Sequence, residues 1–157
     1  MQFRLNITSF RLILVLILIF FSALVSAKER WVGLYVSDNS GISYKDWQNR
    51  WNAYDYGIGW SLGKEAAITA KVDYLTHDYD LVEVPEGKLP IYYGIGAGIE
   101  FGSELSAGFR IPVGVNYLFK KIPYDVFVEI VPMLRIYPST VVAISGAIGV
   151  RYHFNDK

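Results

Sequence analysis

The sequence contains no cysteine among its 157 residues. This absence excludes a disulfide framework and any lipid anchor attached through a cysteine. Basic and acidic residues balance at 15 each, so the basic stripe that a nucleic-acid partner requires is missing. After residue 27, no apolar run approaches the about 20 residues of a membrane-spanning helix. Any membrane insertion of that part of the chain must therefore use strands.

The first 27 residues have the three-part pattern of a secretory signal peptide. Arginines supply a positive start, and residues 12–21 form an unbroken apolar run. Residues suited to the −3 and −1 positions of a cleavage site then precede Lys28. The alternative is an uncleaved anchor, but this apolar stretch is shorter than the about 20 residues of a spanning helix. We therefore predict a signal peptide over 1–27 and one exported domain over 28–157.

Apolar and polar residues alternate with a period of two through most of the remaining chain, which indicates strands. Six runs are clear, and two near the start are weaker. The expected strands cover residues 30–37, 41–48, 54–62, 68–74, 91–101, 105–119, 124–130 and 142–154. Their number is even, and most connections are turns of a few residues. The sequence therefore predicts an all-β fold, an eight-stranded antiparallel up-and-down β-barrel.

Pro112 lies inside one of the expected strands, and Pro132 lies inside another if the run from residue 124 continues past residue 130. Proline has no backbone N–H to donate to a neighbouring strand, so it is rare within a sheet. We expect a bulge or a local break at each proline. We leave the strand registers around these two prolines unassigned. The barrel topology does not depend on those registers.

The composition of the two strand faces separates a soluble barrel from a membrane barrel. A soluble barrel would place Lys, Glu and Thr on its polar face, which meets water. Here that face is mostly Gly, Ala and Ser with single charges of both signs. Because isolated buried charge is costly, we expect these charges to pair inside a narrow lumen. The expected lumen network contains Asp55, Lys71, Asp73, Glu100, Arg110, Glu129 and Arg151, with Asp125 on the same face.

Aromatic residues, 16% of the chain, gather near both ends of the expected strands. The ends nearest the termini hold Trp31, Trp47, Trp51, Tyr54, Tyr74, Tyr93, Tyr117, Phe119, Tyr124, Tyr152 and Phe154. The opposite ends hold Tyr35, Tyr44, Trp60, Phe101, Phe109 and Tyr137. Aromatic rings at both interfaces are typical of transmembrane barrels, because Trp and Tyr sit at headgroup depth. The pattern therefore favours a transmembrane barrel with two aromatic girdles.

The topology orients this barrel in a bacterial outer membrane. An exported chain with an even number of strands is expected to have both termini in the periplasm. The outer loops, at residues 38–41, 63–66, 102–104 and 138–140, are then very short. The longest connection, residues 78–89, carries four acids and falls on the periplasmic side.

Several segments carry a resemblance to a known family. They are Leu89-Pro-Ile-Tyr-Tyr-Gly-Ile-Gly96, Arg110-Ile-Pro-Val-Gly114, Tyr117-Leu-Phe119, Val126-Phe-Val-Glu-Ile-Val-Pro132, Pro138-Ser-Thr140 and Gly146-Ala-Ile-Gly-Val-Arg-Tyr-His-Phe154. Through them the chain resembles a family of short, uncharacterised bacterial outer-membrane-type β-barrels. The resemblance implies a fold similar to the transmembrane barrel of the outer-membrane-protein-A group, and it implies no activity. In such barrels an aromatic residue ends the chain, whereas Asn155-Asp-Lys157 follow Phe154 here.

Three kinds of chemistry receive little support. The glycines at 94, 96 and 98 alternate within a strand, whereas a dinucleotide-binding glycine loop opens a helix. The acids at Asp78, Asp80 and Glu83 match no known calcium loop. Lipid-modifying catalysis needs a base beside a nucleophile, and the two histidines, His77 and His153, fall near the periplasmic strand ends, away from the outer leaflet.

We therefore expect a small outer-membrane barrel with a plugged, charge-paired lumen and a structural or interaction role, without catalysis, cofactor or metal. The expected partners are outer-membrane lipid and, during insertion, the barrel assembly machinery, with a monomer as the working state. The main alternative is a soluble periplasmic lipocalin-like carrier of an apolar ligand. A narrow pore and a lipid-modifying barrel enzyme are the remaining alternatives.

Overall fold

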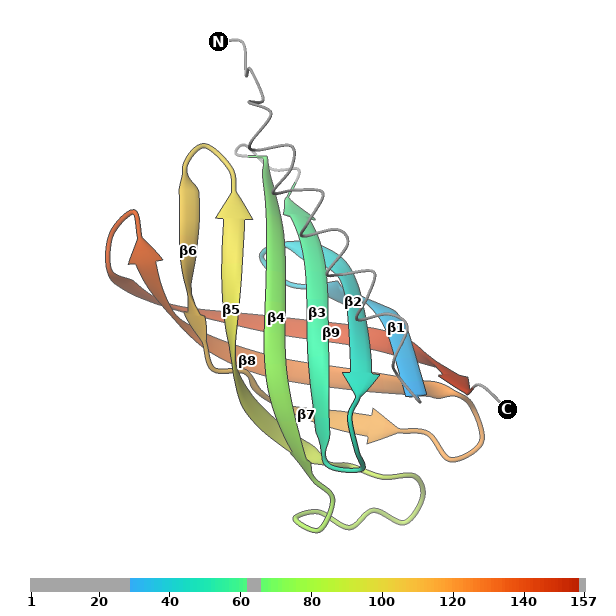
Figure 1. The fold of residues 1–157 in the computed structure, drawn as a ribbon. Coiled ribbons are helices and arrows are strands. Elements are labelled where there is room, and N and C mark those ends of the chain that lie inside the picture. The colour runs from blue at the N-terminus through green and yellow to red at the C-terminus, as the bar shows by residue number, and fades with distance from the viewer. Residues whose placement is uncertain (1–28, 62–65, 156–157) are drawn as a thin grey trace.

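A computed structural model describes residues 29–61 and 66–155 of the chain. The predicted signal peptide over 1–27 and its cleavage site lie outside these residues. The described part is entirely β (Figure 1), with strands β1 (Glu29–Val36), β2 (Ser40–Trp47), β3 (Asn52–Ser61), β4 (Ala67–Asp78), β5 (Ile91–Phe101), β6 (Leu105–Arg110), β7 (Val113–Leu118), β8 (Tyr124–Tyr137) and β9 (Val141–Asn155). Within it, no helix has the length and apolarity needed to cross a membrane.

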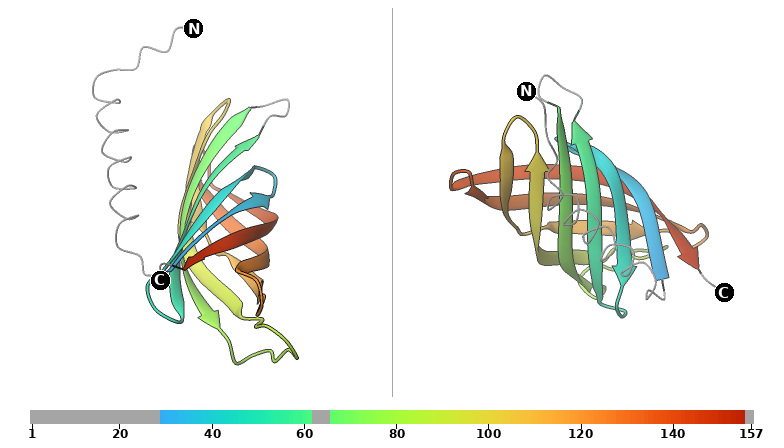
Figure 2. Two further views of the ribbon diagram at one scale, coloured as in Figure 1. Left: turned by 90° about the vertical axis from the view of Figure 1, so that its right-hand side faces the viewer. Right: turned by 45° about the horizontal axis from the view of Figure 1, so that its top comes forward.

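The strands form one closed antiparallel ring. Neighbours along the chain pair with each other from β1 to β5, β6 and β7 both lie between β5 and β8, and β9 pairs with both β8 and β1. The last strand therefore meets the first, and β9 lies beside β1 in both views of Figure 2. Closure leaves no strand edge open to another chain.

The nine strands occupy eight positions in this ring, because β6 and β7 form one strand with a gap at Ile111 and Pro112. The pairing with β5 keeps one register across the gap, from Gly96↔Arg110 to Tyr93↔Val113. The prediction of an eight-stranded antiparallel barrel is therefore confirmed, with one strand interrupted at a proline. The break that we expected at Pro112 is present.

β8 itself runs through Pro132 without interruption, and the break expected there lies in its pairing with β6 and β7, which stops at Met133 and resumes at Ile130. In a hydrogen-bonded antiparallel pair, the N–H and C=O of one residue point to the same neighbour. Pro132 accepts a hydrogen bond from the Ile111 N–H at 2.9 Å, so its missing donor faces the gap between β6 and β7. Pro112 accepts from the Gly94 N–H at 2.9 Å, so its missing donor also falls at this gap. Both prolines thus remove hydrogen bonds at the gap between β6 and β7, Pro112 on the β5 side and Pro132 on the β8 side. The β8–β9 pairing stays intact.

The two faces of the strands differ as the alternation predicts. Every strand turns exposed apolar side chains outward, for example Leu34, Ile42, Ile58, Ile68, Ile95, Phe109, Val113, Val128 and Ile148. Most of the buried residues lie on the opposite face, inside the ring, and many of them are charged. A folded protein in water buries its apolar groups and exposes its charges. This arrangement is the reverse, and it is the one that a lipid-exposed barrel requires.

Candidate functional site

The inward side chains come from alternate positions of each strand, because successive residues of a strand point to opposite faces. β2 turns Ser43, Lys45 and Trp47 inward, and β3 turns Ala53 and Asp55 inward. On the other side of the ring, Asp125, Phe127 and Glu129 come from β8 and Arg151 comes from β9. The lumen of the barrel is thus filled by side chains, and we treat its charged residues as the candidate functional site.

The Arg151 cluster, formed by Arg151, Asp55 and Asp125, lies in the half of the lumen nearer the C-terminus. Arg151 Nη1 lies 2.8 Å from Asp55 Oδ2, and Arg151 Nη2 lies 3.0 Å from Asp125 Oδ2. All three side chains are at most 4% exposed. Ser43 donates to Asp55 at 2.9 Å, and Asn116 donates to Asp125 at 2.8 Å. One buried cation therefore holds two carboxylates from different sides of the ring, and each carboxylate also accepts a neutral hydrogen bond.

The Lys71 cluster, formed by Lys71, Arg110, Asp73 and Glu129, lies further along the lumen. Arg110 Nε is 2.8 Å from Asp73 Oδ1, and Lys71 Nζ is 3.3 Å from Glu129 Oε1. Lys71 also reaches Asp73 at 3.9 Å, and Arg110 reaches Glu129 at 3.7 Å. Tyr92 completes the cluster by donating to Glu129 at 2.9 Å. Two cations and two carboxylates balance, which removes most of the cost of burying them.

The structure thus brings six of the seven predicted lumen charges into two clusters. The exception is Glu100, which lies near the outer end of the lumen. Its carboxylate accepts a hydrogen bond from Asn39 at 2.8 Å. Among residues 29–61 and 66–155, no cation forms an ion pair with it.

A third group, not predicted from the sequence, surrounds Lys45, which is fully buried at the inner end of the lumen. Lys45 Nζ lies 3.0 Å from His77 Nε2 and 4.9 Å from the centroid of the Tyr92 ring. It also lies 5.4 and 5.9 Å from the rings of Trp47 and Trp31. Such cation–π contacts stabilise an ammonium group away from water. The alternation Ser43, Lys45, Trp47 was the available signal, but β2 has a weak pattern because it carries apolar residues on both faces.

Trp31 and Trp47 were predicted at the membrane interface, and this prediction is wrong. Both are inside the barrel, at 5% and 7% exposure, and their ring centroids are 4.9 Å apart. Trp31 lies on the same face of β1 as Tyr35, four residues further along the strand. Tyr35 is also buried inside the barrel instead of joining the outer girdle. The prediction used only the position of each residue along its strand. Successive residues of a strand point to opposite faces, and Trp31 and Trp47 occupy positions whose side chains point inward.

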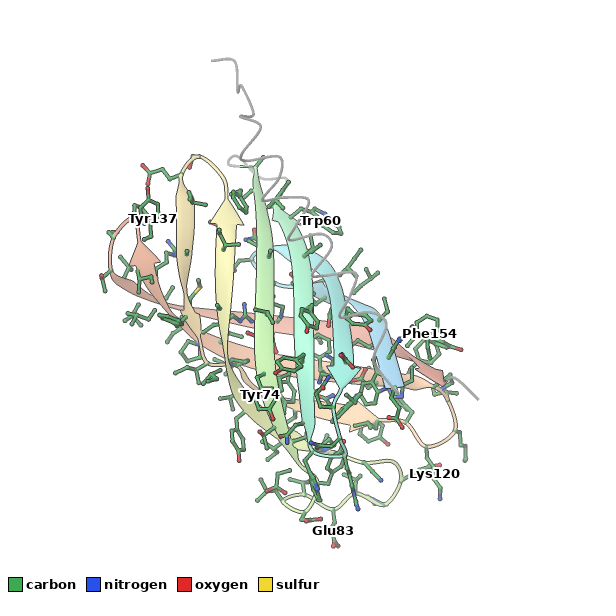
Figure 3. All side chains as sticks on the ribbon, viewed as in Figure 1. Trp60, Tyr74, Glu83, Lys120, Tyr137 and Phe154 are labelled. Carbon is green, nitrogen blue, oxygen red and sulfur yellow. The ribbon has the colours of Figure 1, made fainter. Side chains whose placement is uncertain are left out.

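The other predicted interface aromatics lie outside the lumen. The residues that are more than a third exposed are Trp51, Trp60, Tyr74, Tyr93, Tyr124, Tyr137, Tyr152 and Phe154, and Tyr117 is half-buried. Figure 3 shows Trp60 and Tyr137 toward one end of the barrel and Tyr74 and Phe154 nearer the other. Several of these rings contact each other, such as Tyr124 with Tyr152 at 5.2 Å between centroids.

The long loop between β4 and β5 covers the inner end of the lumen. Tyr79, at its start, packs against the cluster of Trp31, Trp47 and Ala53. The loop is fixed to the end of β7, because the backbones of Lys88 and Leu118 exchange hydrogen bonds of 3.0 and 2.8 Å. Burial raises the pKa of Tyr79 to about 12, so it remains a neutral phenol at physiological pH. The loop that carries four acidic residues thus also supplies an apolar cap through Tyr79.

Glycines make room for the largest lumen side chains. A Cβ atom at Gly149 would overlap the ring of Phe127, which in turn lies 4.1 Å from the Arg151 guanidinium. We predict that Gly149→Ala lowers the free energy of unfolding by about 1–3 kcal/mol, because the well-packed lumen cannot absorb another group. Gly146→Ala is the matched control, since only the Glu129 carbonyl lies near its added Cβ, at 3.7 Å. Urea unfolding of both variants measures the difference, and equal stabilities would contradict a tightly filled lumen.

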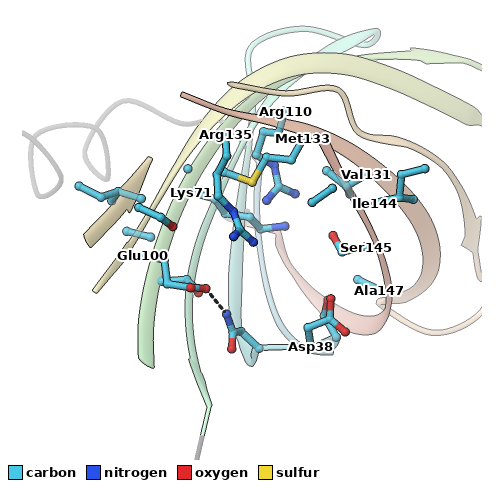
Figure 4. Close-up of a pocket in the computed structure, with 18 of the residues that line it drawn as sticks. Asp38, Lys71, Glu100, Arg110, Val131, Met133, Arg135, Ile144, Ser145 and Ala147 are labelled. Carbon is cyan, nitrogen blue, oxygen red and sulfur yellow. Dashed lines mark hydrogen bonds between the residues drawn. The ribbon is translucent and has the colours of Figure 1, made fainter. Parts of the chain in front are cut away.

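At its outer end the lumen opens into a cavity of about 190 Å³. Lys71 and Arg110 line its inner part, and Arg135, Met133 and Glu100 line its walls (Figure 4). Arg135 extends from β8 into this space and forms no ion pair within the described residues. The charged clusters therefore lie on one side of this cavity, and the outer mouth lies on the other.

Comparison with known proteins supports this fold and gives no activity. No protein-family model matches the chain, and no curated protein matches it in sequence. Among solved structures, the N-terminal β-barrel domain of Pseudomonas aeruginosa OprF is similar with a TM-score of 0.61 and 10% identity, over 82% of this chain and 98% of that one. A de novo designed transmembrane β-barrel is similar with a TM-score of 0.56 and 17% identity, over the same shares. The outer membrane enzyme PagL reaches a TM-score of only 0.44 at 15% identity, over 80% of this chain and 98% of that one, and carries no argument about function. The fold is that of small transmembrane β-barrels.

Proposed function

We propose that this protein is an integral outer-membrane β-barrel with a plugged lumen, which serves as a structural or interaction element and catalyses nothing. The observation that carries the proposal is the inversion of the usual faces. Apolar side chains cover the outside of every strand, while most of the charges inside are buried and form ion pairs. Only a lipid environment makes such an exterior stable as a monomer, because water would drive it to aggregate.

The plug follows from how the charged clusters cross the lumen. Arg151 on β9 holds Asp55 on β3 and Asp125 on β8, and Lys71 on β4 reaches Glu129 on β8. An eight-stranded barrel has an interior just wide enough for side chains. With the apolar cap around Tyr79 at the inner end, these layers leave no continuous water path through the proposed barrel.

The proposal of no catalysis rests on the surroundings of the two histidines. His77 contacts Lys45 and the Trp51 carbonyl, and His153 stacks on Trp31 with 3.6 Å between ring centroids. Within the described residues, no serine or threonine hydroxyl hydrogen-bonds to either ring. A nucleophilic mechanism needs such a pair. Both histidines instead serve as packing and hydrogen-bonding groups in the lumen.

A soluble carrier of an apolar ligand would need an apolar cavity inside the barrel. The cavity at the outer end of the lumen is lined in large part by charged and hydroxyl side chains. This lining favours the membrane barrel over the soluble carrier. In the cell, the working form would be a monomer in outer-membrane lipid, inserted by the barrel assembly machinery.

Fractionation combined with gel mobility tests this proposal. The protein should be found in the outer-membrane fraction of isolated envelopes, and unboiled samples should migrate faster than boiled ones because the closed barrel resists detergent. A periplasmic band without a heat shift would contradict the proposal and support the soluble carrier.

Electrical recording tests the plug separately. In planar bilayers the purified protein should give no discrete conductance steps, because ion-pair layers fill the lumen. A steady ohmic conductance that scales with inserted protein would show a pore, and it would overturn the plugged lumen while leaving the membrane barrel in place.

A further inference from the structure

Two neighbouring cavities lie at the outer end of the lumen. Their volumes are about 190 and 310 Å³, and both are lined by Asn39, Glu100, Ser106 and Arg135. A water molecule occupies about 30 Å³ of liquid, so the smaller cavity has room for about six waters or one small molecule. These spaces play no part in the plug, which lies deeper.

Arg135 differs from the cations deeper in the lumen. Lys71, Arg110 and Arg151 each form ion pairs with buried carboxylates. Arg135 is half-buried on the inward face of β8, yet in the described part of the chain it forms neither an ion pair nor a hydrogen bond. Its five N–H donors face the cavities, and a guanidinium matches a carboxylate in a bidentate geometry.

Glu100 is the corresponding anion. It is partly buried, it lines both cavities, and its hydrogen bond comes from the neutral Asn39. A cation is absent from its ion-pairing range within residues 29–61 and 66–155. Asp38 and Glu104 also line these cavities, but both are exposed, so water solvates them. Among the partly buried groups, one cation and one anion without an ion pair therefore border the same small space, above clusters whose charges are paired.

Confined charges without partners are costly, and a ligand that supplies both partners gains the most from binding. A simple anion would neutralise Arg135 and leave Glu100 unpaired, and a simple cation would do the reverse. We propose that the outer end of the lumen is a binding site for a small free zwitterion of the amino-acid type. Its carboxylate binds Arg135 and its ammonium group binds Glu100, beside the Met133 and Ala143 side of the cavity (Figure 4).

This inference goes beyond the proposed structural role and does not depend on it. The test is an NMR titration of isotope-labelled full-length protein in a non-ionic detergent, with glycine as the zwitterion and with acetate and methylammonium as half-probes. Glycine should give saturable shifts of the Gly98 and Ser145 amide signals. Acetate and methylammonium should bind at least about tenfold more weakly, since each forms only one of the two charged contacts.

Variants connect this binding to the two residues. Arg135→Gln and Glu100→Gln should each weaken glycine binding roughly tenfold or more, while Arg135→Lys should retain part of it because the charge remains. Lys120→Gln, at the opposite end of the barrel (Figure 3), should leave binding unchanged. The heat shift on gels checks that each variant is folded. The absence of saturable glycine shifts, acetate binding as tight as glycine binding, or unchanged affinity in folded Arg135→Gln would each overturn the proposal.

Discussion

Replacing Arg151 with methionine will lower the free energy of unfolding of the barrel by about 3–5 kcal/mol. Arg151 is the only ion-pair partner that the described residues give to Asp55, and its guanidinium also holds Asp125. Removing it leaves Asp55 buried without an ion-pair partner among the described residues, and leaves Asp125 with only the His153 ring, 3.6 Å away. Methionine keeps much of the side-chain volume, so the loss reflects charge rather than a cavity. Urea unfolding in lipid vesicles, followed by tryptophan fluorescence, measures this change.

Two further variants show whether the charge imbalance is the cause. The combination of Arg151→Met with Asp55→Asn and Asp125→Asn removes all three charges together. It should recover most of the lost stability, because a neutral network carries no desolvation penalty for charge. Lys121→Gln removes an exposed cation whose contact is with Glu86 at 3.2 Å, and it should change stability by less than about 1 kcal/mol. Equal losses in the single and triple variants would show that the Arg151 cluster does not act through charge.

The second large effect concerns the outside of the barrel. Ile58 is 48% exposed on the outer face of β3, between Tyr54 and Trp60. If lipid covers this face, Ile58→Arg places a charge in the hydrocarbon region and destabilises the barrel by about 2–4 kcal/mol. If water covers it, the same substitution changes stability by only about 0.5 kcal/mol, as at other exposed sites.

The matched control at this position is Ile58→Leu, which keeps the apolar surface and should be nearly neutral. Unfolding in vesicles compares the three proteins directly. A soluble, stable Ile58→Arg protein that needs no detergent would contradict the membrane barrel.

The alternation of residues was sufficient to predict the strands and their faces. Runs such as Ile91 to Phe101 have apolar residues at every second position. The pattern is regular because, in the proposed membrane barrel, lipid covers the whole outward face of the strand. The predicted lumen charges came from the same alternation, and the structure places all of them on the inner face or at its outer mouth. The break at Pro112 was predictable because the missing N–H is a property of proline itself.

The errors arise where alternation is weak or where contacts cross the lumen. In β2, Tyr44 and Trp47 are both large and apolar although they lie on different faces, so the pattern hid the inward position of Trp47. The partners within the clusters depend on which strands face each other across the ring. Arg151 on β9 meets Asp55 on β3 through the closure of the barrel, and no local pattern contains that information. The burial of Lys45 against His77 was missed for the same reason.

Fluorescence quenching by brominated lipids tests the central claim, that lipid covers the apolar face and excludes the charged one. Two single-tryptophan proteins are needed, one that retains Trp60, which is 41% exposed on the outer face, and one that retains Trp47, which is 7% exposed in the lumen. The other tryptophans are replaced by phenylalanine, and the heat shift confirms folding. Bromine atoms on the acyl chains should strongly quench Trp60 and leave Trp47 nearly unaffected. Quenching of Trp47 rather than Trp60, or of neither in vesicle-associated protein, would contradict this assignment of the two faces.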